Sequence, residues 1–185
     1  MPMDMHEYFR LRCLDTHEAL RNMQGLFENL VNDVNNMQLK DLLRQQYDCI
    51  RADLDGMGKI AERMGQMQPA PQGMEVESGE RMVIVGRTWT GTIGRSTVEH
   101  YRVYVTQIPQ YLIETNAAMI SEEVAHFNLG NFTGLIVLAK ELGEQDIANM
   151  LQESINRGMK VKDTIESSLW QVINSLHQEE QQKAA

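Results

Sequence analysis

The chain has little cysteine, little positive charge and no long apolar run, and each shortage excludes a class of protein. Its two cysteines, Cys13 and Cys49, lie far apart in helical patterns and are expected to be reduced thiols that pack as small hydrophobic groups. Its 17 basic residues against 26 acidic ones give a net charge of -9, so we expect no nucleic-acid partner. The longest uncharged and strongly apolar stretch, residues 127–139, is too short to cross a bilayer.

A secretory leader is also missing from the pattern at the start of the sequence. The first twenty residues include Asp4, Glu7 and Asp15 and contain no apolar segment of the length a signal peptide needs. We therefore expect a cytoplasmic, soluble protein with no membrane partner. The length of 185 residues suits one domain, residues 1–185, better than two.

Apolar residues repeat at helical spacing in four segments. They predict helices over about residues 4–34, 38–64, 110–142 and 144–178. Gly143, which follows Lys140, is predicted to end the third of these as a C-cap glycine. The polar tail, about residues 178–185, is predicted to fray.

Between the second and third segments the composition changes. Residues 66–109 contain Pro69 and Pro71 and then a β-branched, glycine-punctuated stretch, which predicts a long irregular crossover that includes either a short hairpin or an irregular excursion. Residues 96–106 could form a helix, which their β-branched residues mark only weakly. Trp89 in this crossover suggests two roles, a dimer contact or a lid. Two helices, a crossover and two more helices predict an all-α, ferritin-like four-helix bundle.

A Glu-x-x-His spacing in the third helix points to metal chemistry. Within SEEVAHFNLGNFTGLI, residues 121–136, Glu123 precedes His126 by three positions, a spacing that four-helix carboxylate proteins use to hold iron or manganese. Other polar residues on the predicted inner faces extend the set of possible metal ligands. The candidates are His126, Glu123, Glu122, His17 and Asp53.

Each candidate also has an ordinary structural interpretation. His17 fits a neutral histidine that is hydrogen-bonded within the core. Glu122 and Glu123 fit a solvated helix face. A glutamate three residues before a histidine also arises by chance, so the motif alone is a weak signal.

One stretch resembles a known family. The run VAHFNLGNFTGLIVLAKELGEQDIANMLQESI, residues 124–155, is similar to the third and fourth helices of the YciE/YciF-like ferritin-like proteins, in which Glu-His-Tyr-Glu-Ile-Ala precedes an apolar run and Ala-Lys-Gln-Leu-Gly. LRCLDTHEALRNM and LLRQQYDCIRADLDGM, residues 11–23 and 42–57, resemble its first two helices more loosely. The resemblance implies a ferritin-like bundle, often dimeric, with a dinuclear metal centre and an association with bacterial stress responses.

The departures from the family pattern bear on the metal. His126 is kept, and the remaining family ligands fall on His17, Gln46, Asp48, Ala125, Asn128, Asn156, Arg157 and Gly158. Arg157 would place a fixed positive charge beside the site and oppose a divalent cation. The resemblance therefore implies a degenerate centre.

The sequence predicts a non-catalytic, homodimeric bundle in stress or storage physiology, with no certain cofactor. One alternative is a working iron or manganese site, built from the five candidate ligands, that supports iron oxidation or peroxide chemistry. Another is a bundle that binds a small ligand or a partner in an apolar pocket beside Ser154 and Gly158.

Overall fold

A computed structural model describes residues 4–64 and 109–184 of the protein, and these form four long helices and no strand. The helices are α1 (Met5–Asp33), α2 (Met37–Arg63), α4 (Gln110–Glu141) and α5 (Gln145–Ala184). The predicted crossover, with its hairpin, its helix near residues 96–106 and Trp89, lies outside the described residues.

The helices begin where the sequence offers caps. The Asp4 carboxylate accepts the Glu7 N–H at 2.8 Å, and the Asn36 side chain accepts the Leu39 N–H at 3.0 Å, so α1 and α2 each start with a satisfied backbone donor. α4 starts after Pro109. Proline fixes φ and has no N–H to donate, so it is common at the start of a helix and rare inside one. Pro109 therefore marks the beginning of α4.

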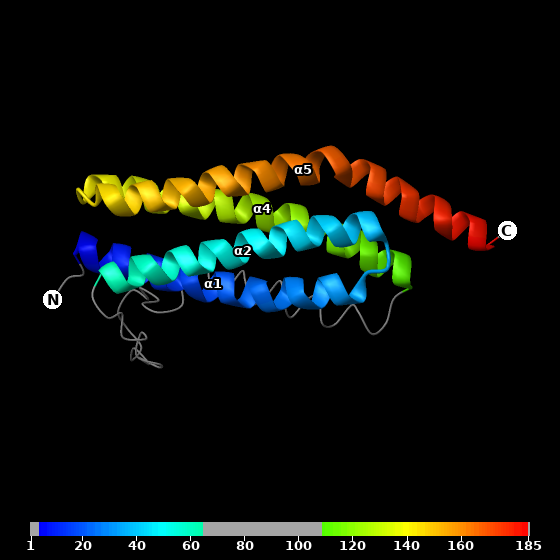
Figure 1. The fold of residues 1–185 in the computed structure, drawn as a ribbon, viewed down its shortest axis with the longest axis horizontal. Coiled ribbons are helices and arrows are strands. Elements are labelled where there is room, and N and C mark those ends of the chain that lie inside the picture. Colours follow the sequence, from blue (N-terminus) through cyan, green and yellow to red (C-terminus); the bar gives the residue numbers. More distant parts are fainter. Residues whose placement is uncertain (1–3, 65–108, 185) are drawn as a thin grey trace, which may run out of the picture.

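Two antiparallel helix pairs, α1 with α2 and α4 with α5, build the bundle (Figure 1). The turn between α4 and α5 depends on Gly143, whose φ of +77° is the left-handed conformation that glycine adopts without a Cβ penalty. Its N–H donates to the Lys140 carbonyl at 3.1 Å, and the Glu144 N–H donates to the Ala139 carbonyl at 2.8 Å. The predicted C-cap glycine is thereby confirmed.

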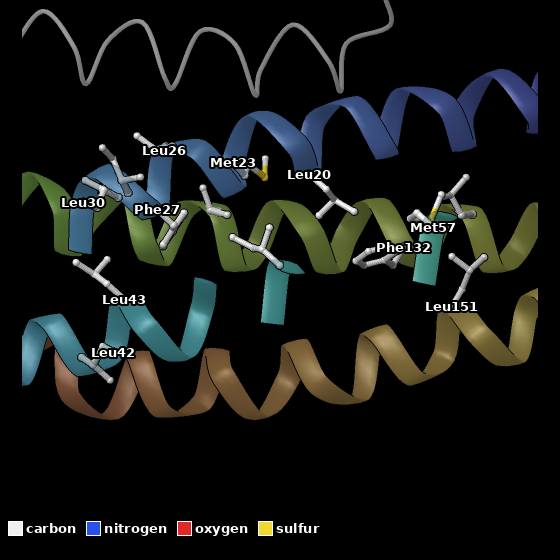
Figure 2. Packing of buried hydrophobic residues seen from close by; sticks show 14 of the residues in the cluster. Leu20, Met23, Leu26, Phe27, Leu30, Leu42, Leu43, Met57, Phe132 and Leu151 are labelled. Carbon is white, nitrogen blue, oxygen red and sulfur yellow. The ribbon is translucent and has the colours of Figure 1, made fainter. Parts of the chain in front are cut away.

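The predicted apolar stripes form one core along the bundle axis. Side chains such as Phe27 of α1, Leu43 of α2 and Phe132 of α4 are at most 1% exposed and belong to one buried cluster. Figure 2 shows Phe27 and Leu43 toward one end of this cluster and Phe132 toward the other. Each buried side chain of this size stabilises the fold by about 1.5–3 kcal/mol relative to an exposed one. The four-helix bundle predicted from the sequence is the observed fold.

The prediction for the tail was wrong. α5 does not end near residue 178 but continues to Ala184, beyond the ends of the other helices (Figure 1). The segment HQEEQQKA has no apolar stripe, yet Glu, Gln, Lys and Ala are strong helix formers that extend a helix already nucleated in the bundle. Of the helices described, none is both long and apolar enough to traverse a lipid bilayer.

Candidate functional site

The middle of the bundle holds polar side chains on the inner faces of α2, α4 and α5. Gln46, Asp53, Ser121 and Ser154 are each at most 4% exposed. A buried polar group costs about 1–3 kcal/mol if it has no hydrogen-bond partner. The hydrogen-bond and ion-pair partners of these four residues therefore decide whether the interior can bind a metal ion or a ligand.

Asp53 of α2 and Arg157 of α5 form an ion pair across the bundle. Arg157 Nη2 lies 2.7 Å from Asp53 Oδ1 and also donates to Ser154 Oγ at 3.0 Å. The Asp53 side chain is 3% exposed, whereas that of Arg157 is 38% exposed. Burial raises the pKa of Asp53 above its ordinary value, and the hydrogen bond from Arg157 offsets part of that rise.

Cys49 lies one helical turn before Asp53 and contacts the other oxygen of its carboxylate. The thiol donates to Asp53 Oδ2 at 3.8 Å between sulfur and oxygen. Burial, with the nearby charge of Asp53, raises the pKa of Cys49 to about 12. The sulfur therefore keeps its proton at neutral pH and is a poor nucleophile and a poor metal ligand.

Gln46 and Ser121 join α2 to α4 by two reciprocal hydrogen bonds. The Gln46 amide donates to the Ser121 carbonyl at 2.9 Å, and the Ser121 hydroxyl donates to the Gln46 side-chain oxygen. Neither side chain carries a charge. This pair contributes no strong metal ligand to the interior.

A small cavity of about 20 Å³ lies between these groups, lined in part by Cys49, Asp53, Leu129, Ser154 and Gly158. That volume accommodates about one water molecule. A Cβ on Gly158 would lie 3.1 Å from Leu129 Cδ2, so α4 and α5 pack closely here. The cavity is thus too small to be the ligand pocket that the sequence suggested beside Gly158.

These interior groups do not fit a dinuclear metal centre. Such a centre needs about four carboxylates and two imidazoles that converge from the helices. Among the described residues the buried acids are Asp15, Asp53 and Glu114, and Glu114 instead accepts the N–H groups of Asn35 and Asn36 beyond the end of α1. Asp53, the acid in the interior just described, is neutralised by Arg157.

The five candidate ligands do not lie together. Asp53 is in the interior. His17 lies half-buried on α1, where burial and the charge of Arg21 lower its pKa. Glu123 is exposed on α4. Only Glu122 and His126 meet, and the His126 side chain is 55% exposed.

A third residue, Glu166 of α5, joins Glu122 and His126. His126 Nε2 lies 2.9 Å from Glu122 Oε1 and 3.3 Å from Glu166 Oε1. Lys162 binds the other oxygen of Glu166 at 2.6 Å and lowers the pKa of that carboxyl. Sequence reasoning missed Glu166 because only the packing of α4 on α5 brings it beside His126; its i,i+4 spacing to Lys162 predicts an ordinary exposed pair.

The chain was compared with known proteins by sequence and by fold. No protein-family model and no curated protein matches the chain. The solved structure of the stress protein YciF from E. coli matches with a TM-score of 0.74 over 94% of this chain and 99% of that one, at 11% identity. The chain has the fold of YciF. The resemblance to YciE/YciF-like proteins is confirmed at the level of the fold.

Two further structures agree with this match. YcfI from Rhodopseudomonas palustris, described as a proposed structural protein, has a TM-score of 0.70 and 13% identity over 89% of this chain and 94% of its own. A protein from Xanthomonas campestris pv. campestris has a TM-score of 0.70 and 12% identity over 96% of this chain and 99% of its own. All three structures therefore share with this chain the fold of the bundle that residues 4–64 and 109–184 form.

Proposed function

We propose that the chain is a non-catalytic helical-bundle protein of bacterial, cytoplasmic stress physiology, in which an internal ion pair replaces the metal centre of ferritin-like proteins. The observation that carries this proposal is the 2.7 Å contact between Asp53 and Arg157 in the middle of the bundle. The Asp53 carboxylate, which could otherwise bind a metal cation, is already paired with the guanidinium group of Arg157.

The charge of Arg157 argues against a metal in the same place. At an effective dielectric constant of about 20, two unit charges about 4 Å apart interact by about 4 kcal/mol, so a divalent ion at that distance would be opposed by about 8 kcal/mol. The Asp53 carboxylate would attract such an ion by a similar amount, and Gln46 and Ser121 add no further negative charge, so the interior offers a divalent ion no net attraction. The interior therefore favours the ion pair over a bound metal.

The matched structures support the physiological part of the proposal. YciF is called a stress protein and YcfI a proposed structural protein, and neither description names a substrate. The water-sized cavity beside Asp53 leaves no room for a substrate in the middle of the bundle, which suits a structural role for this interior.

Aerobic oxidation of Fe(II) tests the absence of catalysis. Protein purified without chelators should contain less than about a tenth of an equivalent of iron or manganese and should oxidise added Fe(II) no faster than buffer. Protein-dependent oxidation that is lost in Asp53→Asn and kept in the surface variant Glu166→Gln would overturn the proposal. That result would favour the working interior iron site.

A second measurement tests the link to stress. In the cells that encode the chain, its abundance should rise on exposure to peroxide or high osmolarity, as followed by quantitative mass spectrometry. Equal abundance in stressed and unstressed cultures would contradict the stress assignment and would leave the conclusion about the interior intact.

A further inference from the structure

The outer surface of the α4–α5 pair carries a second group of polar side chains, separate from the interior ion pair. Glu122, His126 and Glu166 each offer one ligand atom, and these atoms all lie within 4.8 Å of one another. Two of them come from one turn of α4 and the third from α5. The cluster thus joins two helices at a point where the structure is open to solvent.

The distances suit a single metal ion. In a tetrahedral site with metal–ligand bonds of about 2.1 Å, ligand atoms lie about 3.4 Å apart. The observed separations, 2.9 Å from His126 Nε2 to Glu122 Oε1 and 3.3 Å to Glu166 Oε1, differ from that value by amounts that small side-chain rotations supply. Lys162 binds Glu166 Oε2 and leaves Oε1 directed at the imidazole.

The cluster also has an unsatisfied charge. Glu122 Oε2 is shielded from solvent and has no hydrogen-bond partner among the described residues. Glu122 and Glu166 bring two carboxylates to the cluster, and Lys162 brings one ammonium group. A divalent ion would give the shielded carboxylate a partner.

We propose that Glu122, His126 and Glu166 form a surface site for one divalent transition-metal ion, with Zn²⁺ as the favoured ion, that links α4 to α5. Imidazole together with carboxylate is a ligand set that zinc accepts, whereas Mg²⁺ and Ca²⁺ prefer oxygen alone. The exposed His126 ring leaves room for water at the fourth position. This site is independent of the proposed function, because it uses none of the interior groups.

Metal titration of the full chain tests the proposal. After removal of bound metal with a chelator, calorimetric titration with Zn²⁺ should give one equivalent bound, and Co²⁺ should produce the visible absorption of a four-coordinate ion. His126→Asn and Glu166→Gln should each weaken Zn²⁺ binding by more than about tenfold, the loss found even for groups that only support metal ligands. Circular dichroism would establish that both variants keep the helical fold.

Glu123→Gln is the matched control, because Glu123 neighbours Glu122 on α4, is exposed and lies outside the cluster. It should bind Zn²⁺ as the unmodified chain does, whereas Glu122→Gln should not. Binding of less than about a fifth of an equivalent, or affinity unchanged in His126→Asn or Glu166→Gln, would overturn the proposal. Loss of binding in Glu123→Gln equal to that in Glu122→Gln would also overturn the assignment of ligands.

Discussion

At the scale of single residues, Asp53 and Arg157 show how an internal charge is held without a metal. Replacing Arg157 by methionine leaves the Asp53 carboxylate buried with no counter-ion, and we expect the free energy of unfolding to fall by about 3 kcal/mol. The double variant Asp53→Leu/Arg157→Met removes both charges and should regain most of that loss. Urea denaturation of the unmodified chain, the two single variants and the double variant gives the coupling free energy between Asp53 and Arg157. Strictly additive losses would show that the pair is energetically unimportant.

The same pair predicts a dependence on pH. Because burial raises the folded-state pKa of Asp53 above its unfolded value, its contribution to stability is complete below that unfolded pKa and is lost as the pH rises through the folded pKa. Without Arg157 the folded pKa should rise further. The deficit of Arg157→Met relative to the unmodified chain should therefore be largest near pH 7 and shrink toward pH 4. A deficit that is constant over this range would contradict the assignment.

The two cysteines give another prediction for single side chains. Burial raises the pKa of Cys13 and of Cys49 to about 12, so at pH 8 only about one thiol in ten thousand is ionised, against roughly a quarter in an unfolded chain. Ellman's reagent should react about a thousandfold more slowly with the native protein than with the urea-unfolded protein. Rapid reaction of one equivalent in the native state would show that Cys49 is accessible and ionised.

At the scale of the helix, hydrophobic spacing was enough to locate the four helices that residues 4–64 and 109–184 form. The predicted ends of the first three helices fall within about one residue of the observed ones, because caps and glycine mark them in the sequence: Asp4, Asn36 and Gly143. The end of α5 could not be found in this way. Its last turns have no buried stripe, and only the intrinsic preference of their residues for helix continues the element.

Glycine substitutions test these helix ends directly. Gly143→Ala introduces a Cβ at a φ of +77° and should lower the free energy of unfolding by about 1 kcal/mol. Gly56→Ala is the control, since its Cβ would meet nothing within 4 Å in the middle of α2, and it should raise stability by about 0.5–1 kcal/mol. Chemical denaturation measures both changes. Equal effects of the two substitutions would contradict the proposed role of Gly143 in the turn.

At the scale of the whole molecule, the register between helices decides which polar residues meet. Asp53 and Arg157 are 104 positions apart, and His126 and Glu166 are 40 apart. Sequence spacing placed Asp53 and His126 on inner faces, and the structure buries Asp53 but leaves the His126 side chain 55% exposed. Two helix faces can also be brought together at several heights along a bundle. The fold could therefore be predicted from the sequence, whereas the pairing of Asp53 with Arg157 and the part of Glu166 could not.

The state of assembly is a property of the whole molecule. The resemblance to the YciE/YciF-like proteins implies a dimer, and α5 offers a surface for one, because Trp170 is 71% exposed and Met159 49% exposed along a helix that extends past its neighbours (Figure 1). Exposed large aromatic side chains are typical of interface centres. Sedimentation velocity should give twice the chain mass of 21.2 kDa.

Two tryptophan variants locate the contact. Trp170→Gln should shift the protein toward the mass of one chain, 21.2 kDa, if α5 forms the interface, whereas Trp89→Gln should do so if the contact lies in the crossover. We expect the first result, since Trp170 is 71% exposed on α5. A single-chain mass for the unmodified protein at about 50 μM would contradict the dimer itself, because a stable dimer with a Kd near 1 μM is largely associated at that concentration.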